Sequence, residues 1–118
     1  KLWPGLGDHA SQRASHLSST LKRKGHWAAF SKTTRTDHSV VSPWFDHVKA
    51  PALIVMGDKD PDWKDPLAEA TWAASRFTQS EVLAIKGSGH APMLEFPDAV
   101  AQSVISFANR IGFVGAHA

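Results

Sequence analysis

Residues 51–63, "PALIVMGDKDPDW", contain the stretch that decides the fold. The run "ALIVM" at 52–56 is short and continuously apolar, and it is flanked by Pro51 and Gly57. Such a run is typical of a strand that is buried on both faces, as in a parallel sheet. The sequence therefore predicts a strand at 52–56, followed directly by a polar loop that carries three aspartates.

A second apolar run, "EVLAIK" at 81–86, predicts a second strand. Between the two runs, Asp65-Pro66 combines an N-cap residue with a proline at the first helical position, which predicts a helix over 66–77. A last helix is expected to begin at Pro97, because four apolar residues then follow with helical spacing: Val100, Val104, Phe107 and Ile111. We therefore predict a parallel βαβ unit with adjacent strands, followed by a final helix.

Two parallel strands alone leave unpaired edges and uncovered faces. We therefore expect residues 52–111 to belong to a larger sheet whose other strands lie outside this sequence.

The loops that follow the two strands contain the chemically active side chains. The first loop, "GDKDPDW" at 57–63, carries the aspartates, and the second, "GSGHAP" at 87–92, carries His90. Adjacent parallel strands bring these loops together at one edge of the sheet. A carboxylate beside an imidazole orients the ring and stabilises its protonated form, so this pairing is typical of a general base.

These two motifs together resemble the C-terminal portion of the α/β-hydrolase fold over residues 48–111. One family strand ends in Gly-x-x-Asp, which Gly57-Asp58-Lys59-Asp60 matches. The next ends in Gly-x-Gly-His followed by a proline, a glutamate and a proline, which Gly87-Ser88-Gly89-His90, Pro92, Glu95 and Pro97 match. The resemblance implies that Asp60 is the acid and His90 the base of a catalytic triad, with Asp62 and then Asp58 as the next candidates for the acid.

The resemblance also implies a division of the chain. Residues 1–47 correspond to a cap-like helical segment, and residues 48–118 to the C-terminal part of the hydrolase core. In the cap-like segment we predict one helix over 9–24, which Asp8 caps and Gly25 ends, and a shorter helix over 26–34.

The nucleophile of the family is missing from this sequence. It lies in Gly-x-Ser-x-Gly, which the 118 residues do not contain, and no histidine followed by glycine supplies an oxyanion motif. Ser88 lies between glycines but only two residues before His90, which prevents an in-line approach to the ring. The family order is nucleophile, acid, base, so we expect the N-terminal half of the same hydrolase as the partner, either on the same polypeptide or as a separate chain.

Three tryptophans are candidate substrate-binding residues: Trp27, Trp44 and Trp63. They could line an apolar pocket for a small-molecule substrate, although ordinary packing of cap against core is the favoured explanation for each of the first two. Trp63 follows the aspartate loop and either walls the site or supports the loop. The absence of tyrosine lowers the expectation of an epoxide hydrolase, because those enzymes use cap tyrosines.

Composition excludes several other functions. The net charge is +2 and the main basic run, "LKRKG" at 21–25, has no interleaved aromatics, so we expect no nucleic-acid partner. The absence of cysteine excludes disulfides and thiolate metal sites, and the spacing of the seven histidines indicates no metal. No apolar run is long enough to span a membrane and no signal peptide is recognisable, so we expect a cytoplasmic protein that needs no cofactor.

The sequence thus predicts a serine-type hydrolase that acts on an ester or related acyl substrate, to which this chain contributes the acid and the base. One alternative is an epoxide hydrolase or dehalogenase of the same fold with an aspartate nucleophile. Another is a non-catalytic binding protein of the hydrolase fold.

Overall fold

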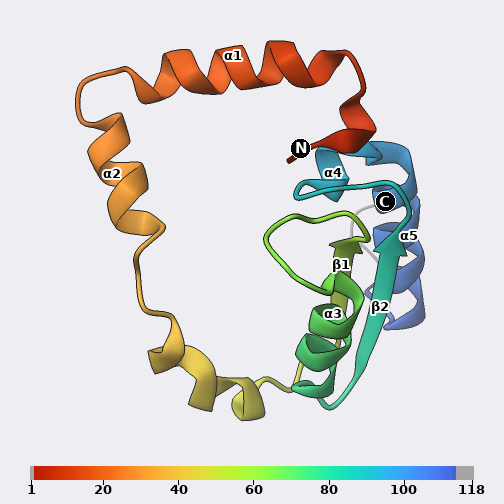
Figure 1. Cartoon of the computed structure of the whole chain (residues 1–118). Coiled ribbons are helices and arrows are strands. Elements are labelled where there is room, and N and C mark those ends of the chain that lie inside the picture. The colour runs from red at the N-terminus through yellow and green to blue at the C-terminus, as the bar shows by residue number, and fades with distance from the viewer. Residues whose placement is uncertain (1, 114–118) are drawn as a thin grey trace.

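The sheet consists of two parallel strands in residues 2–113, which the computed structural model describes. β1 (Ala52–Gly57) pairs with β2 (Ser80–Ile85), with Ala52 opposite Ser80 and Gly57 opposite Ile85. α3 (Pro66–Ser75) connects the strands and packs against both (Figure 1). The predicted adjacent, parallel βαβ unit is confirmed.

The helix α3 begins where its local signals predict. The Asp65 side chain accepts a hydrogen bond of 3.0 Å from the backbone N–H of Ala68, and Pro66 occupies the first turn. The cap satisfies one of the N–H groups that a helix start leaves free. Ala70 on this helix is fully buried, which places the small core of the chain between α3 and the sheet.

Two helices follow β2. The short helix α4 (Pro92–Glu95) was not predicted, whereas α5 (Pro97–Arg110) fills the predicted last helix. The apolar stripe of α5 is only partly covered. Val100 and Phe107 are half-buried, but Val104 is 47% exposed. Arg110 forms an ion pair with Glu81, which fastens the end of α5 to β2.

The N-terminal segment forms four helical pieces that lead away from the sheet and return to its opposite end (Figure 1). They are η1 (Pro4–Leu6), α1 (His9–Leu21), α2 (His26–Thr33) and η2 (Ser39–His47). η2 is joined to the end of α3 by the edge-to-face pair of Phe45 and Phe77, with ring centroids 5.9 Å apart. Residues 2–47 are therefore largely helical, as expected.

The predicted cap of α1 is wrong. Asp8 already has helical backbone angles, φ −68° and ψ −23°, and its side chain makes no cap hydrogen bond. A capping side chain reaches the N–H groups of the first turn from non-helical backbone, which Asp8 does not have. α1 also ends at Leu21, three residues before the predicted end, and Gly25 takes a left-handed conformation with φ 83° before α2.

In the described residues neither strand is covered on both faces, as expected for two parallel strands without the rest of a larger sheet. β1 is half-buried apart from Gly57, and most of β2 is exposed, with Val82 42% exposed. The accessible surface is 8909 Å², whereas a compact monomer of 12.8 kDa exposes about 6,300 Å². The radius of gyration of 16.8 Å likewise exceeds the roughly 13.5 Å of a compact chain of this length.

Across residues 2–113, every helix is too short or too polar to cross a bilayer.

Candidate active site

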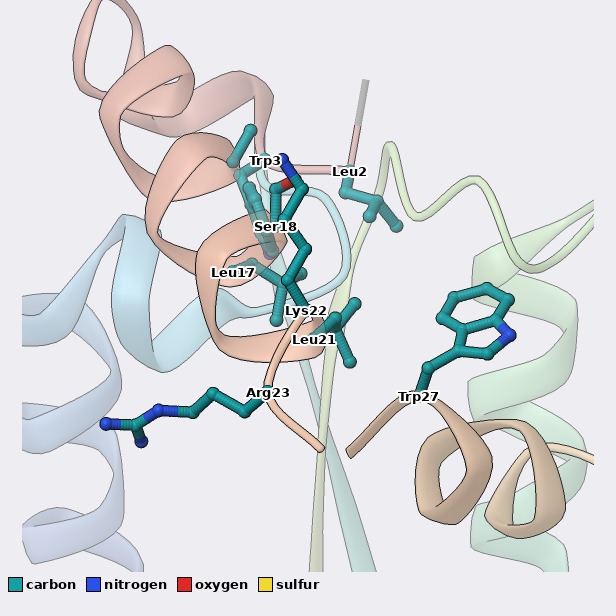
Figure 2. Close-up of a pocket in the computed structure, with 9 residues that line it drawn as sticks. Leu2, Trp3, Leu17, Ser18, Leu21, Lys22, Arg23 and Trp27 are labelled. Carbon is teal, nitrogen blue, oxygen red and sulfur yellow. The ribbon is translucent and has the colours of Figure 1, made fainter. Parts of the chain in front are cut away.

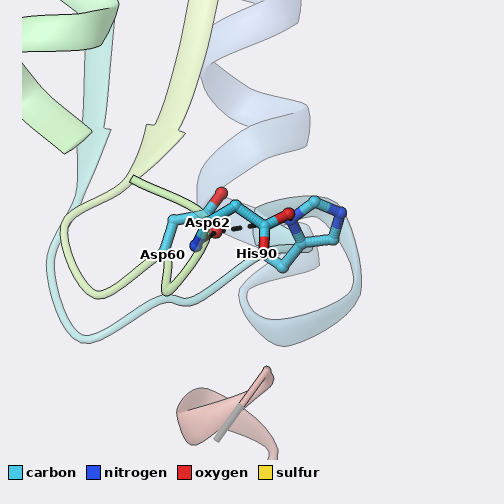
Figure 3. Close-up of side chains that lie close together, drawn as sticks. All are labelled: Asp60, Asp62 and His90. Carbon is cyan, nitrogen blue, oxygen red and sulfur yellow. Dashed lines mark hydrogen bonds and ion pairs between the residues drawn. The ribbon is translucent and has the colours of Figure 1, made fainter. Parts of the chain in front are cut away.

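Asp60 and His90 lie side by side at the carboxyl ends of the two strands (Figure 3). The Nδ1 atom of His90 is 3.3 Å from Oδ1 of Asp60. The Asp60 side chain is 8% exposed, whereas the His90 ring is 51% exposed. The loops after β1 and β2 therefore place a buried carboxylate against a ring that solvent can reach, as the sequence predicts.

Asp62 also contacts the His90 ring, which the sequence reasoning did not predict. Its Oδ2 atom lies 3.1 Å from the same Nδ1 atom, slightly closer than Asp60, and its side chain is 53% exposed. The backbone N–H of Asp62 also donates to Oδ1 of Asp60 at 3.1 Å. The prediction that Asp60 contacts His90 holds, but the contact is not exclusive to Asp60.

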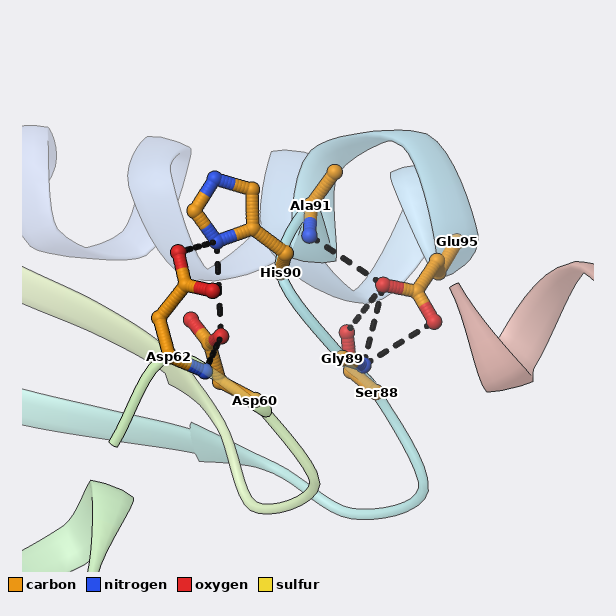
Figure 4. A network of polar contacts seen from close by, with 7 residues as sticks. All are labelled: Asp60, Asp62, Ser88, Gly89, His90, Ala91 and Glu95. Carbon is orange, nitrogen blue, oxygen red and sulfur yellow. Dashed lines mark hydrogen bonds and ion pairs between the residues drawn. The ribbon is translucent and has the colours of Figure 1, made fainter. Parts of the chain in front are cut away.

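This arrangement fixes the protonation of the neutral ring. Both neighbours of Nδ1 are carboxylate oxygens, which only accept hydrogen bonds, so Nδ1 carries the proton. The Nε2 atom then has the free lone pair, and Figure 4 shows it pointing away from both carboxylates. The ring thus has an acid-held side and an open basic side, which is the arrangement of a general base.

Asp58 ties the two loops together and does not contact the ring. Its Oδ1 atom accepts a 2.7 Å hydrogen bond from the N–H of Gly87, and the N–H of Lys59 donates to the carbonyl oxygen of Ser88 at 2.8 Å. Gly57 permits this approach, because a Cβ atom there would lie 2.2 Å from the carbonyl oxygen of Gly89. The glycine of the first motif is therefore required by the closeness of the second loop.

Glu95 is the residue of this site whose contacts the sequence reasoning missed. Its side chain is buried, and it accepts hydrogen bonds from the residues around His90: Ser88, Gly89 and Ala91 (Figure 4). A glutamate five residues after the histidine, between apolar residues, was the available signal. Ser88 is fully buried and donates its hydroxyl hydrogen to Glu95, so it is not placed as a nucleophile.

The three predicted substrate-binding tryptophans are separated. Trp63 directly follows the aspartate loop and is 44% exposed, close to the site in sequence and space. Trp44 lies on η2, at the end of the sheet opposite His90 (Figure 1), and is not brought to the site.

Trp27 lines a separate pocket of about 620 Å³ between the N-terminal segment, α1 and α2 (Figure 2). This volume lies in the range of small-molecule sites. Leu2, which lines this pocket, also contacts the site's histidine loop, because its carbonyl oxygen accepts the backbone N–H of His90 at 2.8 Å. Its walls are mainly apolar and include two cationic residues, Lys22 and Arg23. The lining residues are Leu2, Trp3, Ala14, Leu17, Ser18, Leu21, Lys22, Arg23 and Trp27.

The same acidic pair and ring offer donor atoms for a metal. One atom each from Asp60, Asp62 and His90 lies within 4.8 Å of the others, and two carboxylates with an imidazole suit a zinc ion. A cation bound there would displace the proton from Nδ1, so metal binding and the ring's role as a base compete.

A scan against protein-family models found no match for this chain, and a search of curated proteins found none either.

Proposed function

We propose that this chain supplies the acid and the base of a serine-type hydrolase that acts on an ester or related acyl substrate. The observation that carries the proposal is the contact between the buried Asp60 and Nδ1 of the half-exposed His90, on loops joined by backbone hydrogen bonds. The pair lies at the carboxyl ends of parallel strands, which is where open α/β sheets place their functional residues.

The pair determines the chemistry. Nε2 of His90 takes the proton from a serine hydroxyl while the serine oxygen attacks the ester carbonyl. The resulting imidazolium is stabilised by Asp60, which stays ionised, and it then gives the proton to the departing alkoxide. In the second half of the cycle, Nε2 accepts a proton from water, water oxygen attacks the acyl group, and the proton returns to the serine oxygen.

The nucleophile in this proposal comes from a further segment, on the same polypeptide or on a partner. The incomplete cover of the sheet supports the existence of such a segment. Val82 on β2 and Val104 on α5 expose apolar side chains that a larger sheet and its helices would bury. An apolar small-molecule substrate fits the tryptophans near the site and in the pocket, with Trp63 closest to the reacting groups. The proposal requires no cofactor.

The test is ester cleavage by the protein expressed from its complete open reading frame and purified with any partner it retains. A fluorophosphonate probe should label one serine, and His90→Gln should abolish the labelling while His16→Gln, at an exposed position on α1, should not. Labelling that is equally fast in the His90→Gln variant would refute the proposal. Tight binding of an apolar ester without turnover would favour a binding protein instead.

A further inference from the structure

We propose that Glu95 is the positioning residue for His90, an inference that rests on the proposed function because it assigns a role within the same site. Glu95 is 7% exposed, and its carboxylate accepts five hydrogen bonds from four different residues. The donors are the N–H groups of Gly5, Gly89 and Ala91 and the hydroxyl of Ser88.

The hydrogen bonds surround the histidine on both sides. The N–H of Gly89, just before His90, is 2.9 Å from both carboxylate oxygens, and the N–H of Ala91, just after it, is 3.2 Å from one of them. The N–H of His90 itself donates to the carbonyl oxygen of Leu2 at 2.8 Å. Three successive backbone N–H groups are therefore held, which fixes the direction in which the His90 side chain leaves the chain.

The N-terminal segment is part of the same clamp. Oε2 of Glu95 accepts the N–H of Gly5 at 2.7 Å, so one carboxylate joins residues 2–6 to the histidine loop. Gly89 allows the backbone of the histidine loop to contact the N-terminal segment, because a Cβ atom at Gly89 would lie 2.2 Å from the carbonyl oxygen of Leu2. Glu95 thus holds the His90 loop directly and also holds the segment that supplies the acceptor for the His90 N–H.

A carboxylate is required at position 95 because all of its hydrogen-bond partners are donors. Oε1 faces three donors and Oε2 faces two, with Gly89 shared, and among residues 2–113 no cationic side chain pairs with Glu95. Hydrogen bonds to an ionised acceptor are the strong ones, whereas a glutamine would turn an N–H₂ group towards N–H donors at one end. Even the isosteric Glu95→Gln change therefore breaks the clamp.

The test reads the His90 ring in the complete protein labelled with ¹⁵N-histidine, with the His90 signals identified by their loss in His90→Gln. In Glu95→Gln we expect the ring nitrogen signals to move towards those of a solvent-exposed histidine. We also expect amide hydrogen exchange in the peptide covering 86–96 to accelerate at least tenfold, by loss of local protection. Glu81→Gln, which removes an exposed carboxylate paired with Arg110, is the matched control and should change neither readout.

A purely structural role would lower the melting temperature of Glu95→Gln yet leave the native-state ring signals of His90 unchanged, and that result would overturn the proposal. If Glu95→Gln does not fold, Glu95→Asp decides, because it keeps the charge and withdraws it by one methylene. Ring signals in Glu95→Asp identical to those of the wild type would refute the role. The ring readout does not depend on ester turnover, so it separates failure of this inference from failure of the proposed hydrolase.

Discussion

At Gly57 the loop after β2 lies too close to leave room for a side chain, and the substitution Gly57→Ala tests the importance of this approach. An added Cβ atom would lie 2.2 Å from the carbonyl oxygen of Gly89 and 2.5 Å from that of Ser88. Both obstacles are backbone atoms, so no side-chain rotation relieves the clash. Restoring an ordinary contact distance requires the loops to separate by about 1 Å.

A separation of that size acts directly on the site. The 2.8 Å hydrogen bond from Lys59 to Ser88 and the 3.3 Å contact between Asp60 and His90 both span the two loops. A displacement of about 1 Å takes the ring out of hydrogen-bond range of Asp60, and misplacement on that scale costs roughly 100-fold in rate. Overpacking of this kind also lowers the free energy of unfolding by about 1–3 kcal/mol.

The assay compares wild-type and Gly57→Ala protein, expressed from the complete open reading frame, in ester hydrolysis and urea denaturation. Ala29→Ser is the matched control, because it enlarges an exposed position on α2, away from the sheet and the two loops, and should leave both measurements within error. Wild-type activity and stability in Gly57→Ala would refute the reasoning, because the loops would then not need their present closeness.

Three further predictions concern separate parts of the chain. Asp60→Asn should lower kcat/KM for ester cleavage at least tenfold more than Asp62→Asn, because a buried carboxylate is less screened than an exposed one; equal losses would assign the acid role to the pair. Asp65→Ala should lower the free energy of unfolding by about 1 kcal/mol in urea denaturation. Asp8→Ala should leave it unchanged, because the Asp8 side chain makes no cap hydrogen bond. Val82→Lys should lower the free energy of unfolding of the complete protein in urea denaturation, because it places a charge where the covering segment is expected to pack, and unchanged stability would place that segment elsewhere.

Local sequence signals were sufficient to predict the βαβ unit. The apolar run at 52–56 and the Asp65-Pro66 pair each act within a few residues, so the strand and the capped helix could be predicted without knowledge of the rest of the chain. The meeting of Asp60 and His90 then followed from the parallel order of the strands.

Features that depend on the path of the loops could not be predicted in this way. Asp62 reaches the His90 ring because the loop after β1 turns back over Asp60. Asp58 instead accepts a hydrogen bond from the N–H of Gly87. The role of Glu95 depends on the N-terminal segment, whose Gly5 lies 90 residues away in sequence. The exposure of the strands could be expected from their number, because two parallel strands leave faces uncovered, but apolar composition does not say which elements cover them.

The most direct test of the central claim is kcat/KM for hydrolysis of a p-nitrophenyl ester by the protein from its complete open reading frame. The account predicts that His90→Gln lowers this value by at least 100-fold and that Asp60→Asn also lowers it substantially, whereas the exposed-site control His16→Gln leaves it unchanged. Ester cleavage that persists at the wild-type rate in His90→Gln would contradict the claim that this chain supplies the base of a hydrolase.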